Sequence, residues 1–232
     1  MSALSMCLMR MEQELNPEMT EAFFYKKASF LARLGSGSAC RSVKGSLVVW
    51  GAHEAIEESS DLYGVPFSHK VAPVFQNYQD TILLVDKGEK QVSSTVGHEL
   101  MYGHPFATQR FEQARQNLTQ ITTLLQEGKV AEFIALVESE ALTLHAMMMT
   151  SHPYFILMKP NTLEIIQKIW AYRKAHGSAI CFTLDAGANV HVLYPKSEKK
   201  AVQQFIATEL ATHCQNGHFI HDEVGVGAEE MF

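Results

Sequence analysis

The sequence predicts an α+β fold in which helices cover an antiparallel sheet. Residues 179–184 and 190–194 are β-rich runs separated by Asp-Ala-Gly-Ala-Asn, a strong turn signal for a hairpin. Long runs with helical periodicity lie between the other expected strands. Strands that pair antiparallel, with helices between them, give a helix-covered sheet.

The expected elements follow in order along the chain. Helices are predicted where apolar residues recur at spacings of three and four, over about residues 1–15, 18–33, 111–125, 130–148, 161–176 and 197–213. Strands are predicted for the short apolar or β-rich runs at about 46–50, 81–85, 179–184, 190–194 and 218–224. The polar stretch 52–79 marks a crossing between two parts of the fold, so we expect one domain over 1–78 and a second over 79–232.

Composition indicates a soluble metabolic protein. Of the 232 residues, 47% are hydrophobic, which is enough to fill a core. The 19 basic and 25 acidic residues give a net charge of −6, which argues against nonspecific nucleic-acid binding because such binding needs a positive surface. No run of about 20 apolar residues is available to span a membrane, and no signal sequence is recognisable. We therefore expect a cytoplasmic protein with neither nucleic acid nor membrane as a partner.

The cysteines and histidines do not predict a metal site. The four cysteines lie far apart without Cys-x-x-Cys spacing, so we expect free thiols: Cys7, Cys40, Cys181 and Cys214. Three histidines lie close together near the C-terminus, but their spacing crosses an expected helix–loop–strand transition: His213, His218 and His221. His145 lies beside three methionines on a predicted helix, where a packed or hydrogen-bonded role is expected.

Residues 35–42, Gly-Ser-Gly-Ser-Ala-Cys-Arg-Ser, are the most informative stretch of the chain. Glycines permit a tight turn and a close approach of backbone to ligand, Ser36 and Ser38 add hydroxyl donors, and Arg41 offers a planar fork for carboxylate or phosphate. The stretch therefore predicts an anion site, with Cys40 as a spacer. The alternative is an ordinary Gly/Ser-rich loop.

Three segments of the chain resemble segments of the diphosphomevalonate decarboxylases, which belong to the GHMP kinase superfamily. Residues 31–42, Leu-Ala-Arg-Leu-Gly-Ser-Gly-Ser-Ala-Cys-Arg-Ser, are followed shortly by Trp50 as in that family. Residues 182–189, Phe-Thr-Leu-Asp-Ala-Gly-Ala-Asn, resemble the family's Asp-Ala-Gly-Pro-Asn segment, which carries its catalytic aspartate. Residues 90–97, Lys-Gln-Val-Ser-Ser-Thr-Val-Gly, are similar to its substrate-contacting Ser-Thr turn. The matches keep the family's order, which makes them more specific together than any one alone.

The resemblance implies a GHMP-kinase-like fold and a site for mevalonate 5-diphosphate. It implies a partial N-terminal domain over 1–78 that carries the Gly-Ser-Gly-Ser-Ala-Cys-Arg loop, and a C-terminal domain over 79–232. The implied catalytic residues are Asp185 and Arg41, and no metal-binding residue is implied. The implied substrate-binding residues are Ser36, Gly37, Ser38, Ala39, Cys40, Arg41, Ser94 and Thr95. The family's proline is Ala188 here, which should loosen the turn but leaves the carboxylate unchanged.

The implied activity is the ATP-dependent decarboxylation of mevalonate 5-diphosphate to isopentenyl diphosphate, with ATP and Mg²⁺ as cofactors. The 232 residues contain no Pro-x-x-x-Gly-Leu-x-Ser-Ser-Ala phosphate loop, and the chain resembles the C-terminal two-thirds of a family member. We therefore expect the chain by itself to be inactive and to bind ATP more weakly than millimolar. The alternatives are a kinase or decarboxylase of another phosphorylated mevalonate, or a noncatalytic interaction module. A homodimer is left open.

Overall fold

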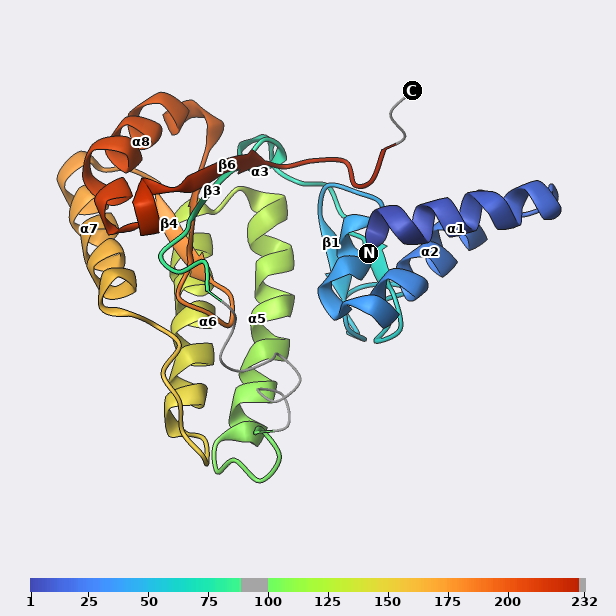
Figure 1. Cartoon of the computed structure of the whole chain (residues 1–232), viewed down its shortest axis with the longest axis horizontal. Helices are drawn as coiled ribbons and strands as arrows, with labels where there is room; N and C mark the ends of the chain where they lie inside the picture. The colour runs from blue at the N-terminus through green and yellow to red at the C-terminus, as the bar shows by residue number, and fades with distance from the viewer. Residues whose placement is uncertain (89–99, 230–232) are drawn as a thin grey trace. The chain divides into compact units, whose positions relative to one another are not determined.

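The structure, a computed structural model, describes residues 1–88 and 100–229 and divides into two compact units. The first unit comprises Met1–Lys70 together with the chain from Val224 onward, and the second comprises Val71–Glu223. Each unit has its own elements, which Figure 1 labels along the chain. The domain boundary expected after residue 78 stays a prediction.

The first unit is built on a pair of packed helices. Its elements are α1 (Ser2–Leu15), α2 (Glu21–Gly35), the 3₁₀ helix η1 (Gly37–Ser42), and the antiparallel strands β1 (Val48–Trp50) and β2 (Gly64–Pro66). Thr20 caps α2, because its hydroxyl oxygen accepts a hydrogen bond from the Phe23 N–H at 3.3 Å. The two helices and the segment after η1 share one buried apolar cluster: Met6, Met9, Met19, Phe24, Ala28, Ala32 and Val43.

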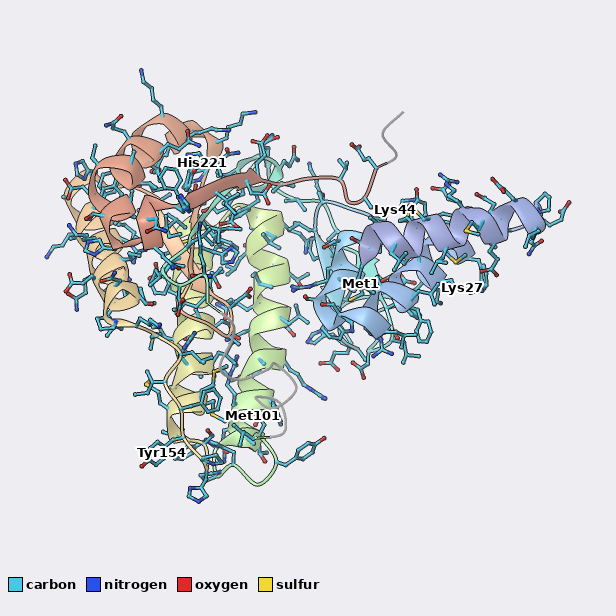
Figure 2. The ribbon with its side chains drawn as sticks, in the orientation of Figure 1. Met1, Lys27, Lys44, Met101, Tyr154 and His221 are labelled. Atoms are coloured by element: carbon cyan, nitrogen blue, oxygen red, sulfur yellow. The ribbon has the colours of Figure 1, made fainter. Side chains whose placement is uncertain are left out.

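Lysine side chains add ion pairs on the surface of this unit. Lys27 and Lys44, both labelled in Figure 2, lie 2.6 Å from carboxylate oxygens of Glu12 and Glu21, respectively. Both pairs are largely exposed, so each contributes little to the free energy of unfolding. The buried cluster is therefore the main source of stability in this unit.

The C-terminal residues return to the first unit. The Gly45 N–H donates a hydrogen bond to Val226 O at 2.9 Å, and the Ala228 N–H donates one to Val43 O at 3.2 Å. Gly227 has a φ of +103°, and a Cβ on it would lie 2.8 Å from backbone atoms of Val43 and Lys44. Only glycine fits this close approach of two backbones.

The second unit contains a four-stranded antiparallel sheet in the order β4-β5-β3-β6. Its strands are β3 (Gln79–Leu83), β4 (Cys181–Leu184), β5 (Val190–Tyr194) and β6 (Phe219–Glu223). In the register, Thr81 of the central strand β3 lies opposite Val192 of β5 and His221 of β6. Alternate residues point to opposite faces, so β3 turns Thr81 and Leu83 to one face and Asp80 to the other.

Helices surround this sheet, beginning with the short α3 (Pro73–Gln76) before β3. The long helices α5 (Ala107–Glu127) and α6 (Val130–Thr150) pack side by side in Figure 1, and α6 contacts β4. The helices α7 (Pro160–His176) and α8 (Lys199–Phe205) bury apolar residues with one face of the sheet. The largest fully buried side chains of this core are Leu83, Ile165, Ile169, Ile180, Phe182, Tyr194, Ile206 and Leu210.

The structure confirms the predicted α+β class and most of the predicted elements. The hairpin of β4 and β5 pairs antiparallel, and Gly128 and Gly177 end α5 and α7 in the left-handed conformation. Two predictions were wrong in detail. The stretch 52–79 contains a strand, β2, which pairs with β1. The last helix, expected to run over 197–213, is α8 flanked by η2 (Lys196–Glu198), a π-helical turn η3 (Ile206–Leu210) and the 3₁₀ helices η4 (Ala211–His213) and η5 (Gln215–Gly217).

One helix within the described residues, α6, is long and apolar enough by length and composition to cross a membrane. A single helix of this kind is weak evidence for a membrane span. Half of its most apolar window is buried inside the unit, and a core helix passes the same test. The apolar residues of α6 that are buried account for its hydropathy: Phe133, Ile134, Leu136, Ala141, Met147 and Met148.

Candidate functional site

The predicted anion segment forms the helix η1 rather than an open loop. Ser36 is extended, with φ −161° and ψ 119°, and connects α2 to η1. The side chains of Ser36, Ser38 and Arg41 are exposed, whereas Cys40 is buried. The segment thus presents two hydroxyls and one guanidinium to solvent, Ser36 from the N-cap and Ser38 and Arg41 from η1 itself.

The glycines of this segment serve packing rather than an unusual backbone conformation. A Cβ on Gly37 would lie 2.8 Å from the Trp50 ring, which is closer than real Cβ atoms approach. Neither Gly35 nor Gly37 is among the glycines with positive φ. The tight-turn role of these glycines stays a prediction, and the contact with Trp50 of β1 is what disfavours a side chain at position 37.

Arg41 is free to bind an anion. Its side chain is exposed, and it has no hydrogen-bond or ion-pair partner among residues 1–88 and 100–229. The nearby Arg33 behaves differently, because its Nε donates a hydrogen bond to Leu62 O at 2.9 Å and its guanidinium lies over the Phe30 ring. Of these two arginines, only Arg41 presents an uncommitted fork.

Cys40 anchors the segment. Its carbonyl oxygen accepts a hydrogen bond from the Ser29 hydroxyl at 2.9 Å, and the same hydroxyl oxygen accepts one from the Gly64 N–H at 2.9 Å. Burial raises the pKa of the Cys40 thiol above its ordinary value, against the opposing charges of Arg41 and Arg33. A buried thiol that resists ionisation is a poor nucleophile, which favours the spacer role.

In the second unit, Asp185 follows the end of β4. Its side chain is 83% exposed, and its carbonyl oxygen accepts a hydrogen bond from the Gly187 N–H at 2.8 Å, which closes the turn to β5. The turn therefore holds a solvent-facing carboxylate at the end of the β4–β5 hairpin. An exposed carboxylate of this kind can act as a general base or as an electrostatic partner.

Side chains from three elements hold this turn. His145 of α6 contacts Asp185 O at 3.1 Å, and the Thr162 hydroxyl of α7 donates to Ala188 O at 2.7 Å. Asn189 accepts a hydrogen bond from the Asp86 N–H at 3.0 Å through its side-chain oxygen. The sequence analysis gave His145 a packed or hydrogen-bonded role, which is confirmed, but no sequence signal connected it to Asp185, 40 residues away.

The imidazole of His191, on β5, lies beside the Asp185 carboxylate. Its Nδ1 is 2.7 Å from Asp80 Oδ2 on β3, and its Nε2 is 4.0 Å from Asp185 Oδ2. The hydrogen bond to Asp80 is the main cause that raises the pKa of His191, and Asp185 and Asp222 raise it further. The sequence analysis missed this residue, because its partner on β3 is 111 residues away.

The remaining predicted residues divide between the two units and the undescribed segment. Ser36, Gly37, Ser38, Ala39, Cys40 and Arg41 belong to the first unit, and Asp185 belongs to the second. Ser94 and Thr95 lie outside the described residues. Among residues 1–88 and 100–229, no three His, Cys, Asp or Glu side chains come together as metal ligands.

Comparisons with known proteins identify the family. Residues 81–229 match the model of the mevalonate 5-diphosphate decarboxylase C-terminal domain. The chain belongs to this family. Residues 1–61 match the diphosphomevalonate decarboxylase-like N-terminal domain. Among curated relatives, the diphosphomevalonate decarboxylase of Aspergillus fumigatus is 29% identical over 179 residues, which are 75% of this chain and 43% of that protein.

Solved structures show the fold. The mevalonate diphosphate decarboxylase of Staphylococcus aureus superposes with a TM-score of 0.78 at 24% identity, covering 97% of this chain and 65% of that one. The structure of MDDEF in complex with MVAPP, AMPPCP and magnesium superposes with a TM-score of 0.72 at 25% identity, covering 88% and 59%. The GHMP-kinase-like fold is thereby confirmed. The chain spans less than half the length of its Aspergillus relative.

Proposed function

We propose that this chain provides the substrate site of an ATP-dependent decarboxylase that converts mevalonate 5-diphosphate to isopentenyl diphosphate. The observation that carries the proposal is Asp185, an exposed carboxylate on a turn held by side chains of α6 and α7, within a chain that belongs to the decarboxylase family. A tertiary alcohol is a poor leaving group, so it is first converted to a phosphate ester. Loss of that phosphate then draws electrons from the breaking carbon–carbon bond.

Asp185 acts on the substrate's tertiary hydroxyl in this proposal. The carboxylate accepts the hydroxyl proton, or stabilises the positive charge that develops at the adjacent carbon. Either task requires that the carboxylate keep one position. The hydrogen bonds that Asp185 O accepts from Gly187 N–H and makes with His145 hold the main chain from which the carboxylate projects.

Arg41, Ser36 and Ser38 bind the substrate's anionic groups. The guanidinium of Arg41 is exposed and has no partner among residues 1–88 and 100–229, so it fits a carboxylate through two parallel hydrogen bonds, and this orients the carboxylate for loss of carbon dioxide. The two exposed hydroxyls of Ser36 and Ser38 fit the diphosphate. Ser94 and Thr95 are proposed as further donors on the strength of the resemblance.

ATP and Mg²⁺ would supply the phosphoryl group that turns the hydroxyl into a leaving group. The described residues do not form a complete site for them, because no metal-ligand cluster occurs among these residues and the 232-residue sequence has no Ser-rich phosphate loop. A structural relative was solved with AMPPCP and magnesium. We therefore propose ATP and Mg²⁺ as cofactors because the chain belongs to this family. Only the substrate is assigned to particular residues of this chain.

The kind of partner and the cellular location of the protein are part of the same proposal. A net charge of −6 fits a protein with a small-molecule substrate rather than nucleic acid as its partner. We propose a cytoplasmic location because the chain belongs to a family of metabolic enzymes.

The test measures substrate binding to the 232-residue chain by titration calorimetry. Mevalonate 5-diphosphate is expected to bind saturably, and mevalonate 5-phosphate more weakly because one charged group is missing. Arg41→Lys is expected to weaken binding, whereas Arg10→Lys, which changes an arginine on α1, is the matched control and is expected to bind normally. Absence of saturable binding at about 10 mM substrate, a regime weaker than −4 kcal/mol, would refute the proposal. Preference for mevalonate 5-phosphate would favour the alternative substrate.

A further inference from the structure

His145 holds the backbone of Asp185 from inside the core. It is 1% exposed, and its Nε2 is 3.1 Å from Asp185 O. A carbonyl oxygen only accepts hydrogen bonds, so Nε2 of His145 carries the hydrogen. Burial lowers the pKa of His145, and the hydrogen bond to Asp185 opposes this only in part. The ring is therefore neutral at and above the ordinary histidine pKa.

The ring of His191 lies near the carboxylate of Asp185 and, unlike the ring of His145, favours its protonated, positively charged form. Its Nδ1 is bound to Asp80, and its Nε2 faces Asp185 Oδ2 at 4.0 Å. Asp80 Oδ1 is buried without a hydrogen-bond partner among the described residues, so this carboxylate depends on the imidazole. A protonated ring serves both carboxylates, because Nδ1 is hydrogen-bonded to Asp80 while the ring's positive charge attracts the Asp185 carboxylate across 4.0 Å.

The charged groups that face His191 come from three elements. They are Asp80 of β3, Asp185 of the β4–β5 turn and Asp222 of β6, and all three are acidic. Burial acts in the other direction and lowers the pKa of His191, but the net direction is upward. The ring therefore remains a cation beyond the pH at which an ordinary histidine loses its proton.

We propose that His145 and His191 are positioning residues for Asp185: a neutral histidine holds its main chain and a cationic histidine holds its carboxylate. The proposal rests on the proposed function, because positioning matters only if Asp185 is catalytic. The contacts of the two histidines with Asp185 are independent of that function. Neither histidine touches the substrate in this arrangement. Each acts through the aspartate.

Positioning by two histidines of opposite charge exists only within a pH window. His145 has a lowered pKa, so its contribution is complete above about 6.5 and is lost as the pH falls through the lowered value. His191 has a raised pKa, so its contribution is complete below about 6.5 and is lost as the pH rises through the raised value. Both contributions are therefore complete together only near pH 6.5. Below that pH, protonation places a charge on the buried His145 ring, and above it His191 loses the charge that attracts the Asp185 carboxylate.

The test is an NMR titration of the 232-residue chain with labelled histidine rings and backbone amides. The rings of His145 and His191 are expected to titrate below and above the ordinary histidine value, respectively. The amides of Asp185 and Gly187 are expected to show two inflections that match the two ring midpoints. A purely structural histidine would not impose its own midpoint on these amides.

Variants of His191 and its partner separate the upper inflection from the lower one. Asp80→Asn is expected to shift the His191 midpoint and the upper amide inflection together toward lower pH, and to leave the lower inflection in place. His191→Gln is expected to abolish the upper inflection. The matched control is His221→Gln, because His221, labelled in Figure 2, lies on β6 of the same sheet. It is hydrogen-bonded to Thr81 at 2.9 Å, on the face opposite to His191 by the strand register. It is expected to change neither inflection.

Variants of His145 test the neutral donor. His145→Gln retains an amide that can donate to Asp185 O, so the lower inflection is expected to disappear while the amide signals of the turn keep their positions. His145→Phe retains a ring without a donor and is expected to displace the Asp185 and Gly187 signals at every pH. If His145→Phe does not fold, His145→Gln and Asp80→Asn still decide the question.

The proposal is overturned if the amides of the turn do not follow the ring midpoints, or if the upper inflection survives in His191→Gln. Its failure is distinct from failure of the proposed function. Coupled inflections in a chain that does not bind mevalonate 5-diphosphate would support the positioning and refute the function. Substrate binding without coupled inflections would do the reverse.

Discussion

Arg41 and Arg173 provide a matched test of a binding arginine against a structural one. Arg41 is exposed and has no partner among the described residues, whereas Arg173 makes a paired contact with Glu138 at 2.6 and 3.0 Å and also donates to Ile180 O at 2.9 Å. The Glu138 side chain is only 9% exposed and accepts a further hydrogen bond from Trp170. Removing the guanidinium therefore has different consequences at the two positions.

The expected magnitudes follow from this difference. Arg41→Met should change the free energy of unfolding by less than about 0.5 kcal/mol, as at other exposed sites without partners. Arg173→Met leaves the buried Glu138 carboxylate without its cation, and such losses cost about 3–5 kcal/mol. Since the Arg173 side chain is 25% exposed, we expect the lower end, about 3 kcal/mol, or roughly 6–12 °C in Tm for a chain of this size.

Substrate affinity should depend on Arg41 and not on Arg173. Arg41→Lys retains the charge but loses the planar fork, so the affinity for mevalonate 5-diphosphate should fall by about 1.5–3 kcal/mol, or roughly 10- to 150-fold. Arg173→Lys should leave the affinity unchanged if the protein remains folded at the assay temperature.

Urea unfolding followed by tryptophan fluorescence measures both stabilities. The chain has two tryptophans, and Trp50 reports the first unit while Trp170, which contacts Glu138, reports the second. Titration calorimetry supplies the affinities. If Arg41→Met destabilised the Trp50 transition by more than about 1 kcal/mol while the affinity stayed normal, Arg41 would be a structural residue and the anion-site assignment would be wrong.

Three further predictions follow from the same contacts. Asp185→Asn should lower the turnover of a catalytically competent form at least about 10²-fold with little change in substrate affinity, as steady-state kinetics would show; near-normal turnover would reduce Asp185 to a turn former. Gly37→Ala places a Cβ 2.8 Å from the Trp50 ring, so it should destabilise the first unit by about 1–3 kcal/mol and change Trp50 fluorescence; an unchanged unfolding curve would contradict the contact. The exposed Cys7 should react with a thiol reagent in the native protein, whereas the three buried cysteines should react only after unfolding; more than one fast-reacting thiol would contradict the burial.

Helical periodicity and glycine caps were sufficient to predict the long helices. The apolar spacing of α5 and α6 has a single interpretation, and Gly128 between them has the left-handed φ of 73° that a C-cap glycine provides. The short strand β2 was missed, because three residues that include glycine and proline carry no alternation pattern. Its pairing with β1 is a tertiary contact, which local sequence does not encode.

The candidate site shows the same limit. The residue types of Asp185 and of the Ser36–Arg41 segment could be read from the sequence, because their chemistry is local. The role of Gly37 could not, since it depends on the Trp50 ring. The contacts of His145 and His191 with Asp185 join residues on separate elements, so only the folded arrangement brings them together.

The return of the C-terminal residues to the first unit gives the chain two covalent crossings between its units, after Lys70 and after Glu223. A protease that cuts only the first crossing produces two fragments, yet residues 226–228 of the larger fragment remain hydrogen-bonded to Val43 and Gly45 of the smaller one. The nicked protein should therefore migrate as one species under native conditions and as two after denaturation. The C-terminal segment thus holds the two fragments together through its hydrogen bonds to Val43 and Gly45. Loss of a few terminal residues would therefore destabilise the first unit, although nearly 200 residues separate the C-terminal segment from Val43 and Gly45 in sequence.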